Sequence, residues 1–272
     1  MGQQHARRVG LAGLGAVGRC LARRLSEGLK GYTIGAVSAR REAPARAFLD
    51  EIGCSAPLVP VEALAEHAEV VVEAVPASLF RSVLEPAIDH RRDAIVLSCG
   101  ALLSNWDLVD RARRTGARIH VPSGAILGLD AVQAAAQGHI HSVTMVTRKP
   151  TAGLDGAPFI REQHLDLADA PEAVLVFQGT AREAVAGFPA NLNVAAALSL
   201  AGVGPDETRL EVWADPSLDR NIHTVEVDSD SAQLSLRIAN IPTEENSGTG
   251  RITALSVLAL LHKLQSPLRI GT

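Results

Sequence analysis

The chain has 272 residues, 47% of them hydrophobic, and charged residues of both signs are mixed along it. This composition is typical of a globular protein with one large domain or two ordinary domains. The formal net charge is −4 and there is no dense run of Lys or Arg, which argues against nucleic acid or an anionic membrane as the main partner. A small-molecule ligand is favoured instead.

The cysteines and the amino-terminal sequence indicate the cellular compartment of the protein. Cys20, Cys54 and Cys99 have no C-x-x-C spacing and cannot all pair, so a disulfide framework is not expected and a reducing compartment fits. The stretch MGQQHARR leads into an apolar run without an A-x-A cleavage site, and nothing there is long enough to span a bilayer. We therefore expect a cytoplasmic protein with no export signal.

The first half of the chain alternates short apolar runs with amphipathic segments. The helix that follows the first run has Val17, Leu21 and Leu25 at helical spacing. Near-continuous apolar strands that alternate with helices indicate a parallel sheet covered on both faces. We predict strands at 9–12, 32–39, 68–76, 94–100 and 118–122, and further helices at 42–53, 78–92 and 106–116.

The second half, from about residue 123, has longer strands and fewer helices, as expected for an open, mixed sheet. We predict one domain over 1–122, a second over 123–247 for substrate binding, catalysis and dimerisation, and a terminal segment, 248–272, whose helix packs back on the first domain. The predicted strands cover 139–150, 173–180, 208–216, 222–229 and 232–240, and the predicted helices lie at 130–138, within 188–202, and at 251–264.

Three glycines follow the first predicted strand in the pattern G-x-G-x-x-G. Gly13 allows a tight turn, Gly15 allows the backbone to approach a pyrophosphate, and Gly18 allows close packing of helix on strand. The backbone amides of Ala16 and Val17, at the start of the helix, would face the phosphates. The predicted fold class is therefore α/β, with a Rossmann-type dinucleotide-binding domain and a second α/β domain. The alternative is a glycine turn used only for packing.

The end of the second strand bears on the choice between NAD and NADP. An NAD-preferring site would have Asp or Glu there to accept a hydrogen bond from the ribose 2′-hydroxyl. The sequence has Ser38, Arg40 and Arg41 instead, and guanidinium groups pair well with a 2′-phosphate. We expect the protein to accept NADP as well as NAD, unless the two arginines only solvate the surface.

Polar groups that follow strands are candidates for the chemistry, because ligands of open α/β sheets bind beyond the carboxyl ends of the strands. Cys99 raises the possibility of a thiolate nucleophile, as in a semialdehyde dehydrogenase, but no base lies near it in sequence and a buried structural cysteine is the default. Asn191 has a second interpretation, as a residue near a helix N-cap. The candidate segments are SCGALL (98–103), PSGAILGLD (122–130) and FPANLN (188–193).

His223 lies at the start of a predicted strand whose alternation places it on the buried face with Val225 and Val227. Imidazole titrates near neutral pH and can act as a general acid or base. A lone histidine in this position is more often a core residue with satisfied hydrogen bonds. No metal-ligand spacing such as H-E-x-x-H occurs, so we predict no metal.

Taken together, the motifs resemble the L-aspartate dehydrogenase family over essentially the whole chain. The glycine loop is common to many dehydrogenases, whereas the stretch FPANLNVAAALSLAG followed by RNIH is specific. The motifs are GLGAVG at 13–18, SGAILGLDAV at 123–132, TRKPTAGLDGAP at 147–158, FPANLNVAAALSLAGVG at 188–204, RNIHTVEV at 220–227 and NSGTGRITALSVLALL at 246–261.

The resemblance implies an activity and roles for particular residues. It implies oxidation of L-aspartate with NAD or NADP to iminoaspartate, which hydrolyses to oxaloacetate and ammonia and can feed NAD biosynthesis. It assigns the active-site histidine to His223 and cofactor contacts to Ala125 and Asn191. It further implies a homodimer. No family role corresponds to Cys99.

The two carboxylates of aspartate need cationic or amide partners. We suggest Arg148 and Lys149, at the end of the long strand 139–150, and the amides of Ser123 and Gly124. Two other functions stay open: a different two-domain NAD(P)-dependent reductase, of the homoserine or cyclic-imine type, and a non-catalytic protein that senses the nicotinamide cofactor.

Overall fold

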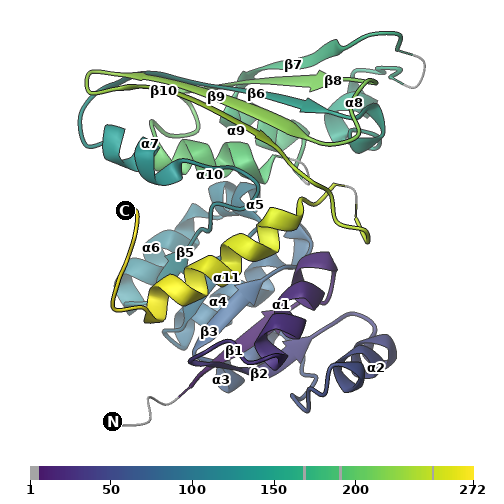
Figure 1. The fold of residues 1–272 in the computed structure, drawn as a ribbon, viewed down its shortest axis with the longest axis vertical. Coiled ribbons are helices and arrows are strands. Elements are labelled where there is room, and N and C mark those ends of the chain that lie inside the picture. The colour runs from purple at the N-terminus through teal and green to yellow at the C-terminus, as the bar shows by residue number, and fades with distance from the viewer. Residues whose placement is uncertain (1–5, 168–169, 190–191, 247) are drawn as a thin grey trace. The chain divides into compact units, whose positions relative to one another are not determined.

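The computed structural model describes residues 6–167, 170–189, 192–246 and 248–272. The chain divides into two compact units, one formed by the residues up to Pro122 together with Ala254–Arg269, and the other by Ser123–Thr253 with Ile270–Thr272 (Figure 1). In the described part of the chain, no helix has the length and apolar character needed to cross a membrane. Asn191 lies outside the described residues.

The first unit contains a five-stranded sheet in the order β2-β1-β3-β4-β5, and all of its strand pairs are parallel, as predicted. In a sheet of this order the chain turns to opposite sides of β1, and ligands bind at the carboxyl ends of β1 and β3. The strands are β1 (Arg7–Ala12), β2 (Tyr32–Ser38), β3 (Val70–Glu73), β4 (Asp93–Val96) and β5 (Arg118–His120).

The helices of this unit connect successive strands. The last helix, α11, contributes Val257 and Leu261 to the same hydrophobic core as β1, β2 and α1. Two hydrogen bonds fix it there: Tyr32 Oη donates to the Leu261 carbonyl at 2.8 Å and Gln265 Nε2 donates to the Gly31 carbonyl at 2.6 Å. The helices are α1 (Ala16–Ser26), α2 (Glu42–Glu51), α3 (Leu64–His67), α4 (Phe80–Asp89), α5 (Cys99–Ser104), α6 (Trp106–Thr115) and α11 (Arg251–Gln265).

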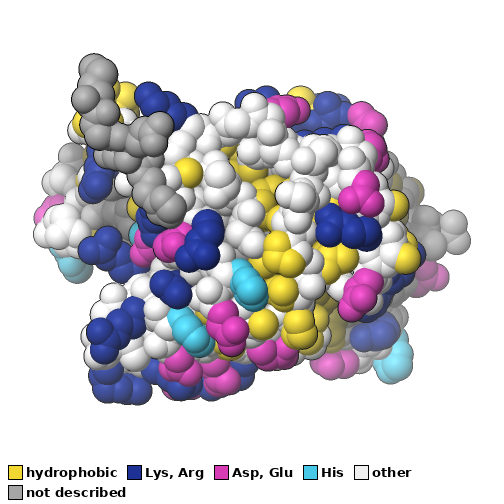
Figure 2. All heavy atoms as spheres, turned by 90° about the horizontal axis from the view of Figure 1, so that it is seen from below, with side chains coloured by type: hydrophobic (Ala, Val, Ile, Leu, Met, Phe, Trp, Pro, Cys, Tyr) yellow, Lys and Arg dark blue, Asp and Glu magenta, His cyan; other side chains and the backbone are white. Residues whose placement is uncertain are grey.

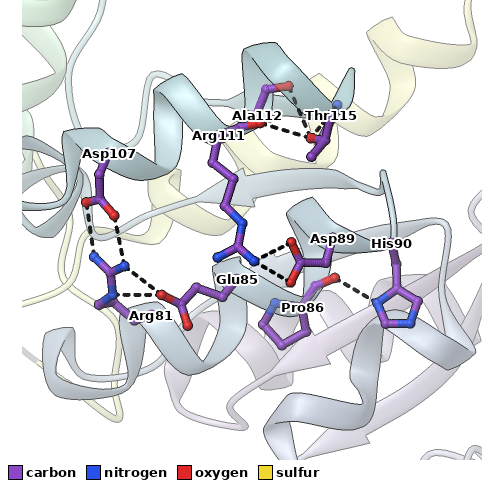
Figure 3. A network of polar contacts seen from close by, with 10 residues as sticks. Arg81, Glu85, Pro86, Asp89, His90, Asp107, Arg111, Ala112 and Thr115 are labelled. Carbon is purple, nitrogen blue, oxygen red and sulfur yellow. Dashed lines mark hydrogen bonds and ion pairs between the residues drawn. The ribbon is translucent and has the colours of Figure 1, made fainter.

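Helices α4 and α6 are joined at the surface by ion pairs (Figure 3). Arg81 of α4 contacts Glu85 at 2.6 Å on its own helix and Asp107 of α6 at 2.9 Å. Arg111 of α6 in turn contacts Asp89 of α4 at 2.7 Å. These side chains are exposed, so the pairs set the orientation of the two helices more than they stabilise the fold.

The second unit contains a mixed sheet, as predicted, and its strand order is β10-β9-β6-β8-β7. The central strand, β6, is parallel to β8 and antiparallel to β9, and β10 and β7 form the edges. The strands are β6 (Ile140–Lys149), β7 (Val174–Thr180), β8 (Thr208–Ala214), β9 (Ile222–Ser229) and β10 (Gln233–Ala239).

One face of this sheet is covered by helices (Figure 1). Along β6 the residues Val143, Met145, Thr147 and Lys149 are buried, whereas the residues between them are partly exposed. Because side chains alternate between the two faces of a strand, these four buried side chains of β6 all lie on the face that the helices cover. The helices of this unit are α7 (Leu129–Ala135), α8 (Pro158–Glu162), α9 (Ala181–Gly187) and α10 (Asn193–Ala201).

Several local predictions were wrong. The predicted strand 94–100 ends at Val96, because Cys99 is the first residue of α5. The helix predicted within 188–202 is present, as α10, and begins at Asn193. Helix α9 was not predicted, although Thr180 and Glu183 form a capping box at its start. The sequence signal was present, but the apolar run before it was assigned to a strand alone.

The surface carries charges of both signs. On the face seen in Figure 2, acidic and basic side chains are interspersed around a central group of hydrophobic side chains. This mixture agrees with the small net charge of −4.

Candidate functional site

The glycine loop connects β1 to α1 in the first unit. Gly13 has a φ of +99°, its amide donates to the Ser38 carbonyl at 2.8 Å, and an added Cβ there would lie 2.4 Å from the Ala74 carbonyl oxygen. A Cβ at Gly18 would lie 2.0 Å from the Gly13 carbonyl oxygen. Packing therefore requires glycine at both positions, since any larger residue would move backbone.

Gly15 is different, because a Cβ there would meet no atom within 4 Å. Packing does not require glycine at this position. Gly15 is the N-cap of α1, and no side chain hydrogen-bonds at this cap. Open space beside the first turn of a helix is the arrangement that accommodates a pyrophosphate. The residues present fit a dinucleotide.

The end of β2 is Ser38, and the two arginines follow it. Arg41 is the N-cap of α2, and both Arg40 and Arg41 are exposed. Exposed guanidinium groups beyond a strand end are available to a phosphate, but their contact with a 2′-phosphate remains a prediction.

A buried carboxylate, missed in the sequence analysis, joins the ends of β3 and β4. Glu73 has no exposed surface and accepts hydrogen bonds from the amides of Val75 (3.1 Å), Leu97 (3.1 Å) and Ser98 (2.9 Å), and from Ser98 Oγ (2.9 Å). Burial raises the pKa of Glu73, and the hydrogen bonds oppose that rise. Glu73 thereby fixes the two loops that follow β3 and β4, at the carboxyl edge of the sheet.

Cys99 lies next to this carboxylate and is itself 3% exposed. Burial, with a smaller contribution from the charge of Glu73, raises the pKa of its thiol to about 12. A nucleophilic cysteine needs the opposite environment, one that stabilises the thiolate. The structure therefore supports the structural role and argues against a semialdehyde-dehydrogenase mechanism.

The segment Ser123–Gly124–Ala125 opens the second unit as a turn. Gly124 has a φ of +63°, and the Ile126 amide donates to the Ser123 carbonyl at 3.2 Å. The segment precedes α7, which begins at Leu129, close to the predicted helix 130–138. A second missed residue, Asn240 at the end of β10, holds the turn by donating from Nδ2 to the Ala125 carbonyl at 3.0 Å.

His223 lies on β9 directly opposite Thr147 on β6. Both side chains are buried, at 2% and 0% exposure, and Thr147 Oγ1 lies 2.7 Å from His223 Nδ1. Thr147 opens the motif TRKPTAGLDGAP, but the sequence analysis gave it no role. With Nδ1 engaged by the hydroxyl, Nε2 is the ring nitrogen left for a ligand or water.

The environment of His223 favours the neutral imidazole. Burial, followed by the positive charge of Lys149, lowers its pKa to about 3. Between pH 6.5 and pH 3 the unfolded chain binds a proton at this residue and the folded chain does not, so folding loses stability as the pH falls through that range. Near neutral pH the folded protein therefore holds a neutral histidine.

The two cations suggested for substrate binding lie on opposite faces of β6. Lys149 is buried, at 3% exposure, on the face that also carries Thr147. Arg148 points to the other face, where it forms an ion pair with Asp215 at 3.2 Å and stacks on Trp213 at 4.9 Å from the ring centroid. The structure thus brings Lys149, and not Arg148, to the side of His223.

No metal site was found in the described part of the chain, where no three His, Cys, Asp or Glu residues are grouped so as to hold an ion. The arrangement instead offers a dinucleotide loop in one unit and a buried His–Thr–Lys cluster in the other. Such a cluster can move a proton and attract an anion.

We predict that Glu73→Gln destabilises the protein. The amide nitrogen of glutamine cannot accept hydrogen bonds, so at least one buried amide loses its partner, at a cost of about 2 kcal/mol in the free energy of unfolding. Urea unfolding followed by circular dichroism measures this, with the exposed Glu62→Gln as the matched control. Equal stability of the two variants would contradict the role given to Glu73.

We predict that His223 remains neutral from pH 8 down to pH 5, because of its burial and the charge of Lys149. Nitrogen-15 NMR of labelled histidine gives the protonation state, and the His223→Gln spectrum assigns the signal. In Lys149→Met the pKa of His223 should rise, since the charge is gone. Titration of His223 at its ordinary pKa in the wild-type protein would refute this account.

Comparison with known proteins identifies the family. Residues 130–264 match the family model "Aspartate dehydrogenase, C-terminal", and residues 13–122 match "Homoserine dehydrogenase, NAD binding domain". L-aspartate dehydrogenase of Bradyrhizobium diazoefficiens is 53% identical, over 97% of this chain and 94% of that protein. L-aspartate dehydrogenase 3 of Bordetella bronchiseptica is 51% identical, over 97% of each chain.

Solved structures agree on the fold. Aspartate dehydrogenase from Thermotoga maritima aligns with a TM-score of 0.70 at 24% identity, covering 98% of this chain and all of the other. A scyllo-inositol dehydrogenase from Lactobacillus casei with bound NAD(H) aligns with a TM-score of 0.54 at 14% identity, covering 98% of this chain and 91% of the other. The resemblance inferred from the motifs is confirmed, and the chain belongs to the L-aspartate dehydrogenase family.

Proposed function

We propose that the protein is an L-aspartate dehydrogenase that oxidises L-aspartate, with NAD or NADP, to iminoaspartate and then to oxaloacetate and ammonia. The observation that supports this most strongly is whole-chain identity above 50% to two relatives named L-aspartate dehydrogenase. A homoserine or cyclic-imine reductase is disfavoured, because the homoserine-type match covers only the first part of the chain, whereas the aspartate-type match covers 130–264.

The first unit would hold the cofactor, which accepts a hydride from Cα of aspartate when bound. Gly13, Gly15 and Gly18, with the amides of Ala16 and Val17, would bind the pyrophosphate. Arg40 and Arg41 would pair with a 2′-phosphate, and the family resemblance adds Ala125 and Asn191. Support for this assignment comes from the open space at Gly15, which packing alone does not explain.

The role of His223 would be to move protons during hydrolysis of the imine. If Nδ1 carries the hydrogen and donates it to Thr147 Oγ1, then Nε2 is an acceptor for the proton of the attacking water. The same nitrogen can return the proton to departing ammonia. The neutral state of His223 in this burial supports the acceptor role.

We further propose that the protein is cytoplasmic and forms a homodimer. In the part of the chain that the structure describes, Cys20, Cys54 and Cys99 form no disulfide, which fits a reducing, cytoplasmic compartment. The family resemblance supports a homodimer formed through the second domain, 123–247. It supports, in addition, a supply of iminoaspartate to NAD biosynthesis.

Initial rates of reduced-cofactor formation test the activity. We expect turnover with L-aspartate, and little with D-aspartate, L-glutamate or L-homoserine. Parallel assays with NAD and NADP report on the arginines, because Arg40→Ala/Arg41→Ala should lose activity with NADP more than with NAD. Tight cofactor binding without turnover of any amino acid would instead favour a cofactor-sensing protein.

His223→Ala should lower kcat by about 100-fold or more, as expected for loss of a general acid–base, and change cofactor affinity by less than about twofold. Steady-state kinetics gives the first value, and fluorescence titration with the reduced cofactor gives the second. Equal losses in both would mean that His223 supports the structure and does not take part in the reaction.

A further inference from the structure

Lys149 is a buried cation that forms no ion pair with any described residue. Its side chain is 3% exposed, and burial alone lowers its pKa to about 8. Among the described residues no carboxylate forms an ion pair with it, although most of the arginines of this chain that lie in partly buried positions have one. An uncompensated charge in such a place is costly, so a protein that keeps it needs an anion from elsewhere.

The position of Lys149 relative to His223 is fixed by strand register. Thr147 pairs with His223 across β6 and β9, and Lys149 lies two residues further along β6 on the same buried face. Lys149 and His223 are therefore diagonal neighbours, whose backbone positions are about 7–8 Å apart. The positive charge of Lys149 contributes to the lowered pKa of the His223 imidazole.

Arg148, the cation next to Lys149 in sequence, already has an anionic partner. Arg148 is paired with Asp215, and that carboxylate also accepts hydrogen bonds from the amide and hydroxyl of Ser217, at 3.0 and 2.6 Å. Asp215 is thus committed to the opposite face of the sheet. Within the described part of the second unit, Lys149 is the one buried ammonium on the His223 side.

We propose that Lys149 determines specificity for an acidic amino acid by forming an ion pair with the side-chain carboxylate of the substrate. This inference rests on the proposed function. With His223 acting at Cα, the α-carboxylate is attached at the reacting carbon itself, whereas the side-chain carboxylate lies one carbon further away. The diagonal spacing of the two residues fits the more distant group.

The ion pair would give discrimination between aspartate and its amide. A buried ammonium that loses its anionic partner keeps its desolvation cost, so L-asparagine, which has the same shape and no charge, should be rejected. Loss of one partner of a buried, hydrogen-bonded charge pair lowers binding by about 30-fold or more.

The test is the ratio of kcat/KM for L-aspartate to kcat/KM for L-asparagine in Lys149→Met. Methionine has a similar length and no charge, and replacing a buried cation that has no ion pair among the described residues should not harm folding. We expect the ratio to fall by about 100-fold, mainly through loss of activity on L-aspartate. Lys30→Met, an exposed lysine in the first unit, is the matched control and should keep the wild-type ratio. Lys149→Gln gives the same comparison if the methionine variant does not fold.

A binding measurement separates this inference from the activity itself. Succinate has two carboxylates and no amino group, so it cannot be oxidised at an amino carbon. It should raise the Tm of the wild-type protein and of Lys30→Met, and not that of Lys149→Met. Absence of L-aspartate turnover with this pattern intact would defeat the proposed function and leave the anion site standing. An unchanged aspartate-to-asparagine ratio in Lys149→Met, or an unchanged effect of succinate, would overturn the role of Lys149.

Discussion

The pairing of β6 with β9 is the constraint on which the candidate chemistry depends. It places Thr147 opposite His223 and puts Lys149 on the same buried face. Because strand side chains alternate, a slip of one residue would turn Arg148 inward and remove all three from the core. The apolar residues Val143 and Met145 on the same face oppose such a slip, since it would expose them. The hydrophobic core of the second unit thus also sets the geometry of its polar cluster.

The first unit depends on a comparable constraint at the carboxyl edge of its sheet. Gly13 passes so close to the Ala74 carbonyl that no side chain fits between the glycine loop and the end of β3. Glu73, one residue earlier, bonds to the amides that follow both β3 and β4. A buried carboxylate surrounded by four donors is rigid, because each lost hydrogen bond leaves a buried group without a partner. The loops that would border the cofactor are thus held by the close approach of the Gly13 backbone and by the buried side chain of Glu73.

Sequence periodicity was enough to predict the alternating elements, the parallel first sheet and the mixed second sheet, since these follow from local hydrophobic patterns. The roles of Thr147 and Asn240 were missed because they arise from contacts with residues far away in sequence, which hydrophobic periodicity does not reveal. Other features that were missed could have been found from the sequence. Glu73 is a charged residue at the end of an apolar run, and strand alternation alone assigns Arg148 and Lys149 to opposite faces.

The charges of Lys149 and His223 are linked, and this bears on when the histidine can act. In the free protein the ammonium disfavours a second positive charge nearby, so the imidazole is neutral but a weak base. An anion that pairs with Lys149 removes that repulsion and raises the proton affinity of His223. Binding of a dicarboxylic amino acid would therefore make His223 a stronger base, whereas binding of a neutral analogue would leave His223 weakly basic. Substrate selection and proton transfer would in this way depend on the same buried pair.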